Sequence, residues 1–106
     1  MADFFVVMST MPTETVASEI ARAVVSERLA ACANIIPAMR SIYLWKGDIH
    51  DDPECLALFK TSSDRLQSLI ERIRSIHPYD VPEIIALPID SGHPGYFSWI
   101  EDCVTE

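Results

Sequence analysis

Hydrophobic and polar positions along this chain fall into blocks that predict four strands and three helices. Residues 3–10 contain an unbroken apolar run, a pattern typical of a strand that is buried on both faces. The next block, from Thr13 to near Leu29, has apolar side chains at helical spacing and predicts an amphipathic helix. Ser62-Ser63-Asp64 is predicted to cap a second helix, whose apolar stripe lies between residues 66 and 76.

The remaining blocks complete a recognisable order. Strands are predicted at 31–46, 54–61 and 84–89, with Gly47-Asp48 in the turn region of a hairpin. Pro94 opens a short final helix. This β-α-β-β-α-β order with an extra C-terminal helix predicts a ferredoxin-like α+β sandwich, in which both main helices cover one face of an antiparallel sheet. Residues 1–106 therefore form a single domain.

The first strand raises the question of what covers the other face of the sheet. It is apolar on both sides, whereas the predicted helices cover only one of them. A homo-oligomer is the simplest cover for the second face. The hairpin strands are also long for so small a domain, and their ends can pair with a neighbouring subunit.

Charge and composition exclude several classes of protein. The chain carries 16 acidic against 8 basic residues, a net charge of −8, so it should repel nucleic acid. No apolar run approaches the roughly 20 residues of a membrane span. Because the N-terminus lacks a basic region before an apolar one, we predict no secretory signal and a cytoplasmic location. Cys32, Cys55 and Cys103 are widely spaced and are interpreted as structural thiols.

The loop from His77 to Glu83 is the strongest candidate for a site. Pro78 and Pro82 restrict their own backbone and that of the preceding residues, so the helix should end at His77. The loop then presents an imidazole and carboxylates on a stiff frame, which suits metal binding. An alternative of equal weight is that His77 only caps the helix and that Glu83 hydrogen-bonds between subunits.

Three segments together resemble the CutA divalent-cation tolerance family. They are Leu29-Ala30-Ala31-Cys32-Ala33-Asn34-Ile35-Ile36-Pro37, Ser41-Ile42-Tyr43-Leu44-Trp45-Lys46-Gly47-Asp48-Ile49 and His77-Pro78-Tyr79-Asp80-Val81-Pro82-Glu83-Ile84-Ile85. The resemblance covers essentially the whole chain as one CutA-like domain. It implies a ferredoxin-like homotrimer, similar in architecture to PII signalling proteins, that acts in copper and divalent-cation tolerance and is not an enzyme.

The resemblance also implies a set of metal ligands. Family metal binding involves a cysteine at the end of the first strand, the histidine of the His-Pro-Tyr segment and the glutamate of Pro-Glu. The last two correspond to His77 and Glu83, whereas the first position is Ser9 in this chain. A hydroxyl is a poorer ligand for a soft metal than a thiolate. The candidate ions are Cu(II), Cu(I) and Zn(II), and the fold requires none of them.

A second candidate site lies among the aromatic residues. Tyr43 and Trp45 share one face of the hairpin by the period-two rule. With Lys60, Arg40 and Trp99 they would line an intersubunit cleft for a small ligand, or else simply pack the trimer interface. The first possibility favours the alternative function of a PII-like regulatory trimer that docks a protein partner. The acidic segment 48–54 lacks the spacing of a calcium loop and is interpreted as a solvated hairpin tip.

Overall fold

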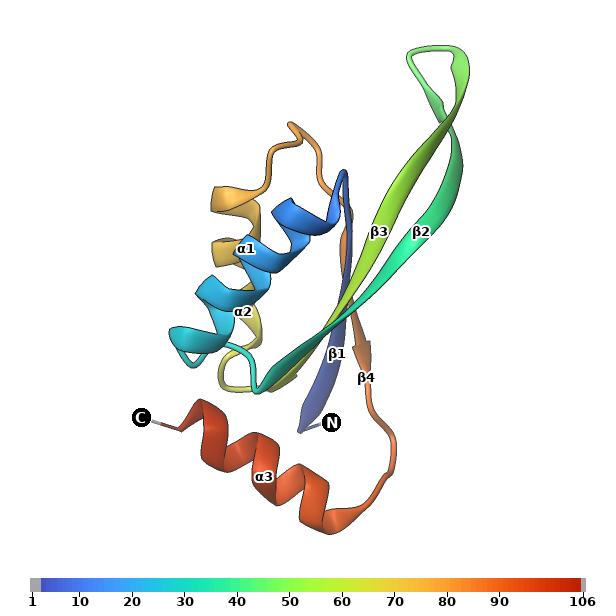
Figure 1. Ribbon diagram of the computed structural model, residues 1–106. Helices are drawn as coiled ribbons and strands as arrows, with labels where there is room; N and C mark the ends of the chain where they lie inside the picture. The colour runs from blue at the N-terminus through green and yellow to red at the C-terminus, as the bar shows by residue number, and fades with distance from the viewer. Residues whose placement is uncertain (1–2, 106) are drawn as a thin grey trace.

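The computed structural model describes residues 3–105 as two helices packed on a four-stranded sheet, with a third helix at one end (Figure 1). The strands are β1 (Phe4–Met11), β2 (Cys32–Trp45), β3 (Asp48–Ser62) and β4 (Ile84–Pro88), and the helices are α1 (Glu14–Ser26), α2 (Leu66–Ile76) and α3 (Pro94–Val104). The sheet order is β2-β3-β1-β4, and every neighbouring pair is antiparallel. The predicted ferredoxin-like α+β fold is confirmed.

The core lies between the sheet and the pair α1 and α2. Val7 of β1 and Phe59 of β3 are paired in register, and both are fully buried. Val24 of α1 and Leu69 and Ile73 of α2 close the core from the helix side and are also fully buried. This apolar stripe on each helix, facing one side of the sheet, is what the sequence periodicity predicted.

The helix ends agree only in part with prediction. Thr13 begins α1 as expected, because its Oγ1 accepts a hydrogen bond from the Val16 N–H at 3.2 Å. The start of α2 was predicted wrongly. Ser62 still belongs to β3, and the residue before the first helical turn is Arg65, whose side chain does not cap the helix. The serine-rich segment therefore ends a strand and forms a turn instead of a cap.

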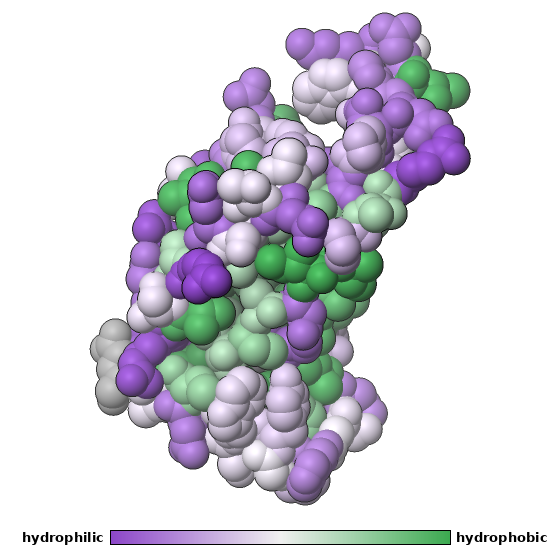
Figure 2. All heavy atoms as spheres, viewed as in Figure 1, coloured by the Kyte–Doolittle hydropathy of each residue, from purple (hydrophilic) through white to green (hydrophobic). Residues whose placement is uncertain are grey.

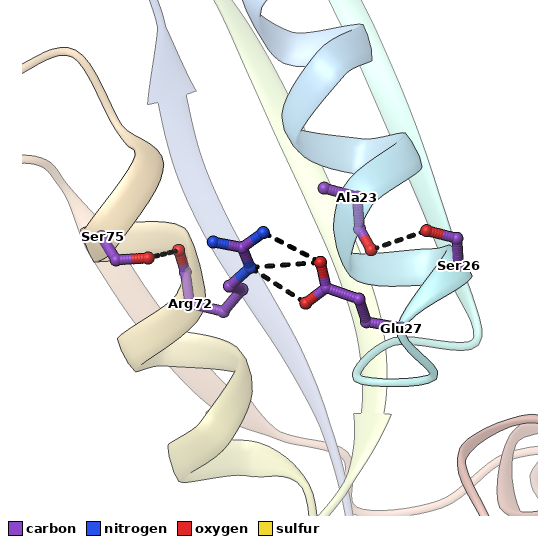
Figure 3. Close-up of polar contacts among 5 residues, drawn as sticks. All are labelled: Ala23, Ser26, Glu27, Arg72 and Ser75. Atoms are coloured by element: carbon purple, nitrogen blue, oxygen red, sulfur yellow. Dashed lines mark hydrogen bonds and ion pairs between the residues drawn. The ribbon is translucent and has the colours of Figure 1, made fainter.

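A surface ion pair joins the two covering helices (Figure 3). Arg72 of α2 donates to both carboxylate oxygens of Glu27, the residue that follows α1, with an Nη2–Oε2 distance of 2.9 Å. These hydrogen bonds lower the pKa of Glu27. Both side chains remain accessible to solvent, so the pair contributes little to stability.

The hairpin of β2 and β3 is longer than predicted and projects beyond the helices as an arm (Figure 1). The third strand begins at Asp48, not at residue 54, and Trp45 pairs directly with Asp48. The turn is therefore Lys46-Gly47, with φ of 51° and 84°. Two central residues with positive φ make a type I′ turn, whose twist matches that of the strands.

A bulge near the base of the arm changes which side chains share a face. Ile36 pairs with Leu56, but the next pair is Met39 with Glu54, and Ala38 takes a φ of 61°. Pro37 and Ala38 of β2 thereby stand opposite the single residue Cys55 of β3, which is typical of a bulge that bends the strand. Beyond it, odd-numbered residues of β2, Tyr43 among them, lie on the same face as Glu54.

The opposite face of the sheet has no helix over most of its area. Here α3 covers only one end, where Phe97 stacks on Phe4 at a ring separation of 4.8 Å. Elsewhere Ile36, Ile85 and Leu87 are 47%, 48% and 47% exposed. Within the subunit, this face of the sheet is therefore apolar and largely uncovered.

Between residues 3 and 105 no helix has the length and apolar character needed to cross a membrane.

Candidate functional site

The imidazole of His77 is held by two hydrogen bonds. As predicted, α2 ends just before it, and the His77 N–H caps the helix by donating to Ile73 O at 2.9 Å. Its ring is only 8% exposed, with Nε2 at 2.8 Å from Thr10 O and Nδ1 at 3.1 Å from the Tyr79 N–H. One tautomer satisfies both contacts, in which Nδ1 accepts and Nε2–H donates. Binding a metal at either nitrogen therefore requires the loss of one hydrogen bond.

Ser9 and Glu83 point to opposite faces of the sheet. Ser9 pairs with Ala57 and Ile84, is fully buried on the helix-covered side, and its Oγ has no hydrogen-bond partner. Glu83 directly precedes Ile84, so strand alternation directs it to the other side, where it is exposed. Within residues 3–105, no three or more His, Cys, Asp or Glu side chains lie close enough to hold a metal ion. One subunit thus does not bring Ser9, His77 and Glu83 together.

A cleft of about 680 Å³ lies between the arm and the loop that follows α2. Figure 2 shows the arm standing away from the body above this region, with hydrophilic side chains over most of its visible surface. The lining consists of Thr10, Ser41, Ile42, Tyr43, Trp45, Glu54, Pro78, Tyr79, Asp80, Val81 and Glu83. It contains three carboxylates and three aromatic rings but no lysine, arginine or histidine. Its size is typical of a small-molecule site.

Two hydrogen bonds to carboxylates hold tyrosines that line the cleft. The first joins the loop after α2 to the arm, and the second lies within the arm. Tyr79 Oη donates to Glu54 Oε2 at 2.6 Å, and Tyr43 Oη donates to Asp52 Oδ2 at 2.5 Å. Burial, followed by the bond to Glu54, raises the pKa of Tyr79 far above its usual value. The bond to Asp52 likewise raises the pKa of Tyr43. Both phenols therefore stay protonated and act as hydrogen-bond donors to carboxylates.

The structure divides the residues that were predicted to line the aromatic cleft into two groups. Tyr43 and Trp45 line the cleft, because the bulge in β2 places them on the face of Glu54. Lys60 and Trp99 lie elsewhere. Lys60 donates to Asn34 on the uncovered face, and Trp99 stacks on Tyr96 within α3 at 5.5 Å.

Arg40, the other predicted anchor, also lies outside the cleft lining. It forms a bidentate ion pair with Asp51 on the opposite face of the arm.

Glu54 and Tyr79 were not singled out from the sequence, although both belong to segments that were. Glu54 ended the acidic hairpin segment, which was interpreted as solvated, yet its side chain is only 9% exposed. Tyr79 belongs to the His-Pro-Tyr segment. No local sequence pattern reveals the pair, because the contact joins residues that are 25 positions apart.

Comparisons with known proteins agree with this architecture. Residues 5–103 match the sequence profile of the family described as CutA1 divalent ion tolerance protein. The chain is 50% identical over 97 residues to the divalent-cation tolerance protein CutA of Thermus thermophilus, covering 92% of this chain and 94% of that protein. It is 55% identical over 97 residues to protein CutA of Mus musculus, covering 92% of this chain and 54% of that protein. The chain thus spans only about half of the mouse relative, and 64% of the Xenopus laevis homologue.

Solved structures give the same result. The Thermus thermophilus divalent cation tolerance protein has a TM-score of 0.92 at 47% identity, covering 96% of this chain and 99% of that one. CutA1 from Ehrlichia chaffeensis has a TM-score of 0.94 at 33% identity, covering 100% and 99%. These likenesses confirm the resemblance drawn from the three sequence segments. The chain belongs to the CutA1 divalent ion tolerance protein family.

Proposed function

We propose that this chain acts in divalent-cation tolerance as a homotrimer that binds cations and catalyses no reaction. The observation that carries the proposal is the cleft, where Glu54, Asp80 and Glu83 face a shared space whose lining has no basic side chain. A concave surface lined by one sign of charge concentrates ions of the opposite sign. The net charge of −8 acts in the same direction.

The ligands in the cleft favour some ions over others. Asp80 and Glu83 are exposed and offer carboxylate oxygens, which suit hard divalent ions. His77 adds a nitrogen for Cu(II) or Zn(II) only if it gives up its contact to Thr10 or to Tyr79. Ser9 offers no thiolate and is buried on the other side of the sheet, so Cu(I) is the weakest candidate.

The uncovered face of the sheet supports a homo-oligomer, and the number of three subunits is what the family resemblance implies. Ile36, Ile85 and Leu87 are about half exposed there, and they adjoin half-buried Met8 and Leu58. A contiguous apolar surface of this kind marks an interaction site in a soluble protein. Copies of this chain are the proposed cover, and the projecting arm extends each subunit toward its neighbours.

Native mass spectrometry of the metal-stripped protein tests the proposal. With stoichiometric Cu(II), Zn(II) or Mn(II), we expect a trimer that takes up a fixed number of ions. Glu83→Gln should weaken binding several-fold, because the charge is lost. The trimer should stay intact, because glutamine keeps the size of the side chain and its carbonyl acceptor. The matched control is Glu101→Gln, an equal loss of charge on α3. A graded series of loosely held ions, equal in both variants, would contradict a defined site.

His77→Ala separates the two interpretations of the histidine. As a ligand, His77 contributes to ion affinity, and its loss should weaken Cu(II) or Zn(II) binding several-fold by calorimetry. As a cap alone, its loss should leave that affinity unchanged and lower only the stability of the loop.

A second candidate function is regulatory binding of a small molecule in the same cleft, with the loops docking a protein partner. The volume of about 680 Å³ favours this, because it far exceeds what one metal ion occupies. A thermal-shift screen of metabolites against metal-free protein tests it. Nucleotides are poor candidates, because the chain has only three glycines and no glycine-rich phosphate loop.

A further inference from the structure

We propose that the cleft binds an aliphatic polyamine, with a protonated amine on the Glu54 carboxylate and the chain of methylenes against the rings of Tyr43, Trp45 and Tyr79. This goes beyond tolerance of metal ions, because it assigns an organic cation to the cleft. It rests only on the negative charge and the aromatic rings of the lining. It does not depend on whether a metal binds there.

The first argument is the state of Glu54. Its side chain is 9% exposed and accepts a hydrogen bond from Tyr79. Within residues 3–105 it forms no ion pair with a basic side chain. A buried carboxylate without a counter-charge is costly to desolvate. The carboxylate can accept further hydrogen bonds beyond the one that it has. A protonated amine would supply both the missing charge and the missing N–H donors.

The second argument is the aromatic lining. Ammonium groups are attracted to the faces of Trp and Tyr rings. The ring of Trp45 already accepts such a group, since Lys46 Nζ lies 5.7 Å from its centre. The two tyrosines are held in place beforehand, Tyr43 by stacking on His50 at 5.3 Å and Tyr79 by packing against His77 at 4.8 Å. Rings fixed in this way lose little conformational freedom when a ligand binds.

The third argument distinguishes a polyamine from other cations. The carboxylates of the cleft do not converge on one point within the described residues, and an extended cation with several amines can reach more of them than a single compact ion can. The exposed Asp80 and Glu83 add two carboxylates to the buried Glu54, which favours a ligand with more than one positive charge. Pro78 and Val81 also line the cleft, and their apolar surfaces suit methylene groups. A single ammonium would leave part of this lining unused.

The test uses spermidine as the probe and Trp45 fluorescence as the signal. In a Trp99→Phe background Trp45 is the single tryptophan of the chain. The intact oligomer is titrated in the presence of EDTA, so that no metal contributes. We expect saturable binding of one spermidine per subunit. Glu54→Gln should weaken it by about tenfold or more, because a hydrogen bond to a charged group is lost. Glu101→Gln, the matched control, should bind as tightly as the parent.

Three results would overturn the proposal. These are the absence of saturable binding, equal binding by Glu54→Gln and Glu101→Gln, and an equal signal from MgCl₂ at the same ionic strength. If Glu54→Gln fails to fold, Glu83→Gln and Trp45→Leu replace it, read by calorimetry, and unchanged affinity in both would be equally decisive. None of these results bears on metal uptake without spermidine, so failure here is distinguishable from failure of the proposed tolerance function.

Discussion

The two faces of the sheet carry similar apolar side chains but differ in what covers them. Val7 and Phe59, on the face under α1 and α2, are fully buried. Ile85 and Leu87, on the other face, are nearly half exposed. The chain covers one face by itself and leaves most of the second uncovered. The comparison teaches that an apolar position in this sequence does not by itself indicate burial within the subunit.

The largest effect is expected on the covered face. Phe59→Ala removes a fully buried ring and leaves a cavity between the sheet and both helices. We expect a loss of about 3–5 kcal/mol in the free energy of unfolding, measured by urea titration at several protein concentrations. Leu58→Ala, one residue away on the other face, is the control. An equal loss at both positions, independent of protein concentration, would contradict the difference between the faces.

A charge on the uncovered face should act on assembly more than on folding. Leu58→Asp places a carboxylate among the apolar side chains of this face, where a second copy would have to desolvate it. We expect dissociation of the oligomer, with helix content by circular dichroism retained. Light scattering coupled to size exclusion measures this, and Gln67→Asp on the exposed side of α2 is the control. Persistence of the oligomer would show that another surface forms the interface.

A smaller effect, of opposite sign, is expected at Ser9. Its hydroxyl is fully buried on the covered face and lacks a hydrogen-bond partner. Removing an unpaired buried polar group by Ser9→Ala should raise the free energy of unfolding by about 1 kcal/mol. A loss of stability in urea titration would instead indicate that the hydroxyl has a partner, such as a water molecule.

The smallest effect concerns the ion pair on the outer side of the covering helices. Because Arg72 lowers the pKa of Glu27 below its usual 4.5, the pair adds stability above that pH and loses it as the pH falls through the lowered value. The difference in thermal stability between the parent and Glu27→Gln should therefore be small near pH 7 and vanish as the pH falls through the lowered pKa of Glu27. A difference that grows in acid would contradict the assignment.

Most of the fold could be predicted from the sequence, because it depends on local patterns. The apolar stripes located both covering helices, and Pro78 located the end of α2. The predictions failed where tertiary contacts override local preference. Ser62-Ser63-Asp64 has the composition of a helix cap, yet pairing with Phe4 of β1 keeps Ser62 in a strand. Polar residues 48–53 do not look like a strand, but pairing with β2 makes them one.

The candidate site was less predictable. The sequence identified the His77–Glu83 loop and the aromatic pair Tyr43 and Trp45 as separate features. Only the structure places the loop and the pair on two sides of one cleft. The bulge near Ala38 decides this, because it changes which residues of β2 face Glu54. Such a shift in register leaves no periodic signal in the sequence.

The sequence by itself determined the order of the elements, the two-sided apolar first strand, the acidic character and the family. These follow from side-chain periodicity and short motifs, which act over a few residues. The tertiary structure alone decided that His77 uses both ring nitrogens, that Ser9 and Glu83 face opposite sides, and that Glu54 is buried against Tyr79. Those properties depend on strand register and on contacts between distant segments, and only the folded chain brings these segments together.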